Sequence, residues 1–330
     1  MYNKPVGKKK NPLPGKLAFF ATLGLRWLAN LLSFKGSLAL GNLVGRLFWL
    51  VVRATRLKVA MDNMRNLYPS ASGEELSALA RRMCLHWGRF IIQAGRLKSL
   101  TREDADKLIR FEGLENLKEA FALKKGVILA TAHFGWFETA NGALALEGYP
   151  VWSVIRTVDN KDIDWLTDDC RTSTGLGVIK KENAATEIIK HLRSGGMVTI
   201  AVDQNAGFNN IFTPFLGKLA ATIVAPAVAS LRTGAPVLPM FSIWDGRENI
   251  LKVKIHPAVK LHPTGSMSAN IRLVTMKINE ALEEAVKAAP EQWLWIHKRW
   301  KTAPEEKDLA AIEADLKIIN ATTGASAPAK

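Results

Sequence analysis

Acidic residues are absent from the start of this chain, although the 330-residue sequence contains 30 aspartates and glutamates in total. The first of them is Asp62, and eleven lysines and arginines precede it, so most of the net charge of +15 is concentrated there. Cysteine is scarce as well: Cys84 and Cys170 are isolated, which excludes a disulfide framework and indicates a reducing compartment. The six histidines lack metal-ligand spacing, so we expect no metal site.

Two apolar runs, residues 17–34 and 37–52, lie among these positive charges. Each is near the lower limit for a membrane-spanning helix, and each contains an arginine, Arg26 or Arg46. An arginine at the centre of a bilayer costs at least ~2.5 kcal/mol, and basic residues flank both ends of each run. We therefore expect a pair of helices that lies in the interface of an anionic leaflet.

Aromatic residues of the same segment, Trp27, Phe48 and Trp49, would sit at headgroup depth. A cleaved signal peptide is the alternative, but the first run lacks a convincing small-residue cleavage site and more apolar, basic sequence follows it. Nucleic acid is the other usual partner of a basic chain. Here the positive charge alternates with long aliphatic runs and no zinc, helix-turn-helix or ribonucleoprotein motif is visible, so we expect anionic membrane lipid and no nucleic acid.

Downstream of this segment, strand and helix patterns alternate. Short apolar runs predict strands at residues 127–131, 151–156, 197–203, 237–244 and 250–255. Helical periodicity predicts helices at residues 74–97, 162–173, 186–193, 223–233 and 267–288. The last two strands are expected to be antiparallel neighbours. The alternation indicates an α/β fold with a mixed, mostly parallel sheet flanked by helices, preceded by N-terminal membrane-associated helices.

Three regions follow from these patterns. Residues 1–58 form the basic, apolar membrane-associating segment, and residues 59–301 form the main α/β domain. Residues 302–330 form a C-terminal tail that is helical over 305–319 and then fades into a sequence typical of disorder.

A histidine and a glutamate five positions apart, His133 and Glu138, are the strongest candidates for catalysis. His133 directly follows a buried apolar run, at the expected turn from a strand into a helix, where side chains are held rigidly but face an opening. Glu138 would lie on the first turn of that helix and reach back to the imidazole. There it would fix the tautomer and stabilise the imidazolium that forms when His133 takes a proton from a hydroxyl. A solvated His–Glu pair is the alternative.

The His133-x4-Glu138 motif resembles the His-x4-Asp/Glu motif of glycerolipid acyltransferases. Further segments, from about Asn63 to Lys301, resemble one branch, the late acyltransferases of lipid A biosynthesis (the lauroyl/myristoyl type). They are NMRNLYP at 63–69, EGLENL at 112–117, RTVDN at 156–160, DQN at 203–205, PFLG at 214–217, TGAPVLP at 233–239 and EQWLWIHKRW at 291–300. The branch usually has Asn-Trp where this chain has Trp136-Phe137.

This resemblance implies a glycerolipid acyltransferase-like fold and a membrane-associated O-acyltransferase on the cytoplasmic face of the bacterial inner membrane. The donor would be an acyl thioester on acyl carrier protein, or on coenzyme A, and the acceptor a hydroxyl of a lipid A precursor. No cofactor is expected, because the thioester is a co-substrate. The Trp136-Phe137 departure leaves another acceptor open, a lysophospholipid or a glycolipid, and a non-catalytic membrane scaffold of the same fold is the rival from a different class.

Four further residues are candidates for substrate binding: Arg156, Arg171, Asp203 and Arg299. Arg156 and Arg171 could bind an oxyanion or the phosphates of the acceptor and of a phosphopantetheine arm, with a surface salt bridge as the alternative for each. Asp203 ends a buried strand and could bind an acceptor hydroxyl, orient Arg171 or serve as a plain cap. The resemblance places Arg299 and the tryptophans of 293–300 near the active-site end, although these tryptophans could simply close the core.

Overall fold

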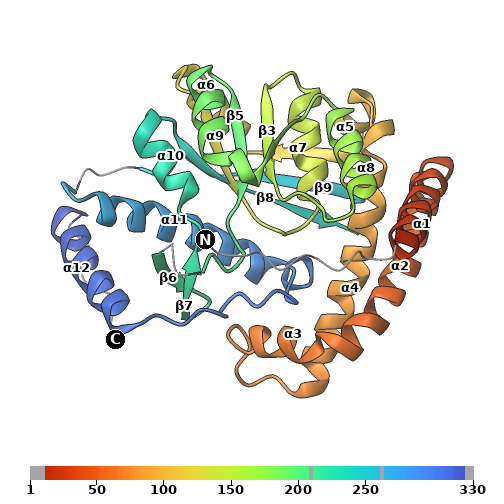
Figure 1. The fold of residues 1–330 in the computed structure, drawn as a ribbon, viewed down its shortest axis with the longest axis horizontal. Coiled ribbons are helices and arrows are strands. Elements are labelled where there is room, and N and C mark those ends of the chain that lie inside the picture. Colours follow the sequence, from red (N-terminus) through yellow and green to blue (C-terminus); the bar gives the residue numbers. More distant parts are fainter. Residues whose placement is uncertain (1–11, 208–210, 261–263, 324–330) are drawn as a thin grey trace, which may run out of the picture.

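The computed structural model describes residues 12–207, 211–260 and 264–323, and these form an α/β fold around one main sheet (Figure 1). The strands are β1 (Ile109–Glu112), β2 (Val127–Thr131), β3 (Val151–Ile155), β4 (Gly177–Lys180), β5 (Met197–Ala201), β6 (Ile211–Phe215), β7 (Lys218–Thr222), β8 (Val237–Asp245) and β9 (Ile250–Ile255). The α-helices are α1 (Pro12–Leu31), α2 (Phe34–Thr55), α3 (Leu57–Met64), α4 (Gly73–Gly95), α5 (Arg102–Leu108), α6 (Leu114–Ala122), α7 (Phe137–Leu146), α8 (Lys161–Thr172), α9 (Ala184–Arg193), α10 (Ala225–Thr233), α11 (Met267–Ala288) and α12 (Glu306–Thr323). Three 3-10 turns are η1 (Leu97–Ser99), η2 (Lys181–Asn183) and η3 (Pro290–Gln292).

The main sheet has the strand order β1-β9-β8-β2-β5-β3-β4. β8 and β9 are antiparallel, and the other neighbouring pairs run parallel. The predictions of a mixed, mostly parallel sheet and of the antiparallel pair are therefore confirmed. The central strand β2 is buried along its whole length, as a strand covered by helices on both faces should be. Its position places the turn that follows it at the middle of the sheet's edge.

Four strands are not indicated by the sequence patterns, and each has a physical reason. β1 and β4 have four residues each and form the two edges of the sheet, where a strand needs little apolar sequence. β6 and β7 form a separate hairpin, and β6 contains Pro214, which is unusual in a strand. The two residues that join them, Leu216 and Gly217, both have positive φ, as the tight two-residue turns of hairpins require.

Helix α2 packs closely against α4 because both helices carry glycine where they cross. A Cβ atom on Gly88 of α4 would lie 2.2 Å from the backbone nitrogen of Gly45 and 2.3 Å from the carbonyl oxygen of Gly41, both in α2. Only glycine fits so close an approach of two backbones. A capping box starts α4, because the Ser72 and Glu75 side chains each bond the other residue's backbone. The α2–α4 pair is therefore a fixed part of the molecule.

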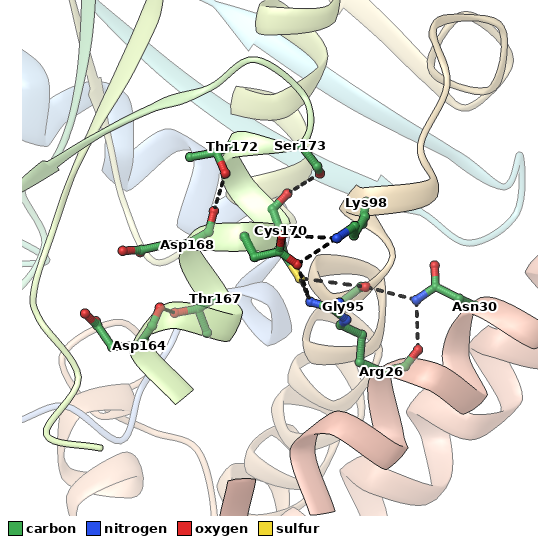
Figure 2. Close-up of polar contacts among 11 residues, drawn as sticks. Arg26, Asn30, Gly95, Lys98, Asp164, Thr167, Asp168, Cys170, Thr172 and Ser173 are labelled. Atoms are coloured by element: carbon green, nitrogen blue, oxygen red, sulfur yellow. Dashed lines mark hydrogen bonds and ion pairs between the residues drawn. The ribbon is translucent and has the colours of Figure 1, made fainter. Parts of the chain in front are cut away.

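Helix α1 is attached to the rest of the protein through polar side chains on its inner face. Arg26 forms an ion pair of 2.8 Å with Asp169 of α8, and Lys98 of η1 binds the same carboxylate at 3.1 Å (Figure 2). Asn30 donates to the carbonyl of Gly95 at the end of α4. Arg26 is thus directed into the protein, so the bilayer cost that its position in an apolar run suggested does not apply to it.

The outer faces of α1 and α2 expose large apolar side chains. On α1 they are Leu17, Phe20, Trp27 and Leu31, and on α2 they are Leu43, Leu47, Leu50 and Val51. Trp27 is 65% exposed, whereas Phe48 and Trp49 are half-buried against the core. Within the described ranges, α2 is the one helix that is long and apolar enough to cross a membrane, judged by length and composition. The positive charges before residue 12 lie outside the part of the chain that the structure describes.

The predicted tail helix is present as α12 and is fastened to α11. Arg272 of α11 forms a buried ion pair of 2.8 Å with Asp315 of α12, and the same arginine donates to the Phe212 carbonyl of the hairpin. The predicted disorder falls largely on residues 324–330, which lie outside the described residues.

Candidate active site

The loop between β2 and α7 carries His133 and is held in one conformation by close packing. Gly135 has a φ of +60°, and a Cβ atom there would lie 1.6 Å from the Ser242 carbonyl oxygen of β8. No other residue fits this position without moving the backbone. The loop is thereby pressed against the neighbouring strand.

A second contact comes from the C-terminal tryptophan segment. Phe134 forms an antiparallel β-bridge with Trp293, and backbone hydrogen bonds join Gly135 to Gln292 at 3.1 Å and Leu294 to His133 at 3.2 Å. Trp293 is buried, with its ring edge-on to Phe215. This segment closes the core, as one reading of the sequence proposed, and it also fixes the loop that carries His133.

The imidazole of His133 is held by Asp203. The distance from His133 Nδ1 to Asp203 Oδ1 is 2.9 Å, and the backbone N–H of His133 donates to Asp203 Oδ2 at 3.1 Å. The indole N–H of Trp293 donates to the same Oδ2 at 2.9 Å. Three groups therefore donate hydrogen bonds to the buried carboxylate of Asp203: the ring and backbone of His133 and the indole of Trp293. These hydrogen bonds favour the ionised form of Asp203.

Two pKa shifts result from this arrangement. Burial alone would raise the pKa of Asp203, but the adjacent His133 and the hydrogen bonds that the carboxylate accepts lower it to about 2. Burial alone would lower the pKa of His133, but the charge and hydrogen bond of Asp203, with a smaller contribution from Glu138, raise it above its ordinary value. The pair therefore favours an imidazole that accepts a proton readily.

The tautomer of His133 follows from these contacts. Because Asp203 is an acceptor at Nδ1, that nitrogen carries the proton and Nε2 is left with its lone pair. The side chain is 28% exposed, and the amide of Gln204 lies 3.4 Å from Nε2. Nε2 is thus the atom positioned to take a proton from a substrate.

Glu138 is placed differently from the expectation. Its carboxylate accepts two-pronged hydrogen bonds from Arg171 of α8, at 2.6 Å from Nη2 and 3.1 Å from Nε to Oε1. The contact to the imidazole expected of Glu138 is made by Asp203 instead. The reason is the sheet register: Thr131 of β2 lies opposite Ala201 of β5, so the residues two positions beyond each strand emerge side by side. Glu138, on the first turn of α7, is directed toward α8.

The other predicted arginines occupy contrasting environments. Arg156 lies on the loop after β3, is 80% exposed and forms a long ion pair of 3.9 Å with Asp159. Arg299 is fully buried: it donates to the Ala221 carbonyl and to Thr222 Oγ1, and its guanidinium lies 5.3 Å from the Phe215 ring centroid. Burial lowers its pKa to about 10. In this structure Arg299 supports the hairpin beneath the site and has no surface to offer a substrate.

Two histidines near the loop have structural surroundings. Helical periodicity over residues 74–97 favours a surface position for His86, but the residue is buried beside Trp87, and burial lowers its pKa to about 3. Other elements of the protein cover the face of α4 that carries His86. His297 accepts a hydrogen bond of 2.9 Å from the backbone N–H of Asn205, next to Gln204. His86 and His297 therefore have structural surroundings, in α4 and beside Asn205, respectively.

A cavity of about 230 Å³ has Glu138 in its wall. It is bounded by α1, α4 and α8, and its walls are mostly apolar, with Leu25, Phe90 and Leu166 among them. Glu138 and Arg171 line the same cavity. An apolar space with an ion pair in its wall suits a molecule with a hydrocarbon tail and a polar end.

The chain resembles known proteins over most of its length. Residues 5–302 match the family described as bacterial lipid A biosynthesis acyltransferase. The chain is 27% identical to a lipid A biosynthesis acyltransferase of Haemophilus influenzae, over 81% of this chain and 83% of that protein. It is 26% identical to the lipid A biosynthesis palmitoleoyltransferase of Escherichia coli, over 86% and 90% of the two chains, and 25% identical to the lauroyltransferase of the same organism, over 86% and 91%.

Proposed function

Because the chain belongs to the bacterial lipid A biosynthesis acyltransferase family, we propose that it transfers a fatty acyl group from a thioester to a hydroxyl of a lipid A precursor. The observation that carries the proposal is the His133–Asp203 pair, which leaves Nε2 unprotonated on a side chain that is 28% exposed. We take acyl carrier protein as the donor, since such carriers are acidic and a net charge of +15 would steer them to this protein. Acyl-coenzyme A presents the same thioester and is the alternative donor.

In the proposed reaction, His133 Nε2 removes the proton from the acceptor hydroxyl while its oxygen attacks the thioester carbonyl carbon. Asp203 holds the ring and stabilises the imidazolium that forms. The tetrahedral intermediate then collapses: the C–S bond breaks, the ester remains on the acceptor, and the proton on His133 passes to the departing thiolate. Both substrates are bound together, and no acyl-enzyme forms.

The Glu138–Arg171 pair has a separate place in this proposal. The carboxylate is too firmly held by Arg171 to orient the imidazole by contact, but its negative charge still favours the imidazolium. Arg171 and the exposed Arg156 supply positive charge for the thioester oxyanion or for phosphates of the substrates, in line with the sequence prediction. The apolar cavity beside Glu138 would take the acyl chain of the donor.

The proposed location is the cytoplasmic face of the bacterial inner membrane. Its support is the apolar outer face of α1 and α2, together with the two free cysteines, which fit a reducing compartment. The helices would lie in the interface with the apolar side chains directed toward the acyl chains of the lipid. Anionic membrane lipid is accordingly a proposed partner.

The test is incubation of the purified protein with radiolabelled acyl carrier protein and a lipid extract that contains the lipid A precursor. We expect label in the precursor with the wild type and none above background with His133→Ala. Label in a lysophospholipid or glycolipid instead would assign the other acceptor. No label in any lipid, from a folded protein, would leave only a scaffold role and refute the proposed activity.

The departure at Trp136-Phe137 makes the identity of the labelled lipid informative. Trp136 does not face the substrate, because it is buried and stacked on Trp244 with ring centroids 4.1 Å apart. Phe137, by contrast, lies 5.5 Å from the His133 ring and stacks on Phe90. Phe137 is therefore the part of the departure that can influence which acceptor is used.

A further inference from the structure

Helices α2 and α4 enclose a groove of about 850 Å³ that the proposed reaction does not use. We call it the arginine groove, because five arginines line it: Arg46 and Arg53 from α2, and Arg81, Arg82 and Arg89 from α4. None of His133, Glu138, Arg171 or Asp203 lines it. The close crossing of the two helices leaves their long side chains to spread apart on this flank, and that forms the groove.

The positive charge of the arginine groove is uncompensated. In the described part of the chain, none of the five arginines forms an ion pair, and one acidic residue, Glu74, lines the groove with them. Other cations of this protein are paired, as Lys180 is with Asp164 and Asp168. Five guanidinium groups with one carboxylate, Glu74, among the lining residues repel one another, and an anion bound between them relieves that repulsion.

An apolar stripe runs beside the groove along the same helix. Leu43, Leu47 and Leu50 are each more than half exposed, and they follow the helical spacing of four and three residues. At 3.6 residues per turn, this stripe lies roughly a quarter of a turn from the stripe that contains Arg46 and Arg53. A third stripe of α2, with Gly41 and Gly45, packs on α4. One helix thus offers positive charge and exposed hydrocarbon side by side.

We propose that the arginine groove binds the phosphate of an anionic phospholipid of the bilayer, whose acyl chains lie along Leu43, Leu47 and Leu50. The inference rests on the membrane association put forward under the proposed function and names the lipid class and the site. Guanidinium groups match phosphate through paired hydrogen bonds. Arg89 already donates from Nε to Asn42 at 2.7 Å, whereas Arg81 and Arg82 are exposed and form no ion pair within the described residues. The bound lipid is a surface ligand and not the acyl acceptor.

An acidic protein is the rival occupant, and the apolar stripe argues against it. A carrier protein docked on the arginines would leave Leu43, Leu47 and Leu50 in water, whereas an amphiphile covers both the charge and the hydrocarbon. A membrane-spanning position of α2 is also disfavoured, because it would bring Arg46 and the charged α4 face into the bilayer. When α2 lies at the level of the headgroups, its arginines contact phosphates and its exposed leucines contact acyl chains.

The experiment is co-sedimentation of the full-length protein with vesicles of phosphatidylcholine, with and without phosphatidylglycerol. In Arg81→Gln/Arg82→Gln, binding to the anionic vesicles should weaken about 30-fold, since each basic residue near such a surface contributes about fivefold (~1 kcal/mol). The matched control Lys118→Gln/Lys125→Gln removes two exposed charges from the region of α6, outside the groove, and should weaken binding far less. Arg53→Gln, on the other wall, should weaken it about fivefold and serves if the double variant does not fold.

Three results would overturn the proposal. An equal loss of vesicle binding in the groove variant and in the matched control would show that the protein's overall positive charge, and not the groove, attracts it to anionic vesicles. Displacement by inorganic phosphate beyond that by sodium chloride of equal ionic strength would show a free-anion site. Normal sedimentation of the groove variant with a raised KM for acyl carrier protein would assign the groove to the carrier. Acyl transfer by the wild type in detergent is measured separately, and its absence would refute the proposed activity and not the lipid site.

Discussion

The carboxylate of Asp203 accepts hydrogen bonds from both the ring and the backbone of His133, at 2.9 Å and 3.1 Å. The two residues extend from the adjacent parallel strands β2 and β5, so the sheet itself sets the distance between them. A third hydrogen bond, from Trp293, comes from the opposite end of the chain. The orientation of the imidazole therefore depends on three separate segments of the chain.

Replacement of His133 by alanine should lower the rate of acyl transfer about 10²–10⁴-fold, because the general base is lost. The fold should persist, since the side chain is partly exposed and fills no core position. Initial rates and circular dichroism of the same preparation check this. Near-normal turnover in His133→Ala would contradict the mechanism.

Replacement of Asp203 by asparagine should be nearly as damaging, on the order of 10²–10⁴-fold, because an amide no longer enforces the tautomer with a free Nε2. It should also change the pH profile. In the proposed mechanism, transfer by the wild type requires neutral His133 and should fall as the pH drops through the raised pKa of His133. Without the Asp203 charge, burial remains and the pKa falls, so the acid limb should move to lower pH. An unmoved limb would mean that another group sets it.

Replacement of Glu138 by glutamine should spare more activity than Asp203→Asn, because the His133–Asp203 contact remains. It should cost stability instead, about 3–5 kcal/mol, since Arg171 is left largely buried without its anion. Denaturant unfolding measures the loss. In Glu138→Gln/Arg171→Met the loss should be smaller than the sum of the single changes. Activity as low as that of Asp203→Asn would point to a direct role of Glu138 in the chemistry.

Initial rates should give intersecting double-reciprocal lines, because direct transfer requires the donor and the acceptor in one complex. The measurement varies acyl carrier protein at several fixed acceptor concentrations. Parallel lines, or an acyl group found on the protein by mass spectrometry, would falsify the absence of a covalent intermediate.

Replacement of Gly88 by alanine should destabilise the protein by about 1–3 kcal/mol, because the added methyl group collides with the α2 backbone and overpacks the crossing. Thermal unfolding in detergent checks this. Gly24→Ala is the matched control, since a Cβ atom there meets nothing within 4 Å. Equal melting temperatures for the two variants would show that α2 can move away from α4 without cost.

The sequence is sufficient to predict most of the central sheet and its helices, and the reason is burial. β2 and the long helix α11 have strong apolar periods, and α11 extends over the predicted range. Edge strands and the β6–β7 hairpin have short or proline-containing sequences, so local pattern does not reveal them. His86 is buried although it lies in an amphipathic helix, because the periodicity of a helix does not show how many of its faces other elements cover.

The structure pairs His133 with Asp203 and Glu138 with Arg171, whereas it leaves Arg156 exposed and buries Arg299 against the hairpin. His133, Glu138, Arg171 and Asp203 are all brought close to one another, yet spacing along the chain assigned the partner of His133 to Glu138. The register of two parallel strands decides the pairing, and a signal for it was present: His133 and Asp203 each follow a buried apolar run at the same offset. Trp293 could not be assigned from the sequence, because its indole reaches Asp203 across 90 positions of chain.

The β-bridge between Phe134 and Trp293 also has a consequence for biosynthesis. The ribosome synthesises α1 and α2 early and the segment with Trp293 near the end. The loop that carries His133 therefore lacks its contact with Trp293 until the intervening chain has been made. At ordinary rates of translation this delay is on the order of ten seconds. The helices proposed to hold the membrane are therefore available well before a competent imidazole exists. A newly made molecule would reach its lipid surface before it can react, and an unfinished chain released into the cytoplasm would be inert toward thioesters.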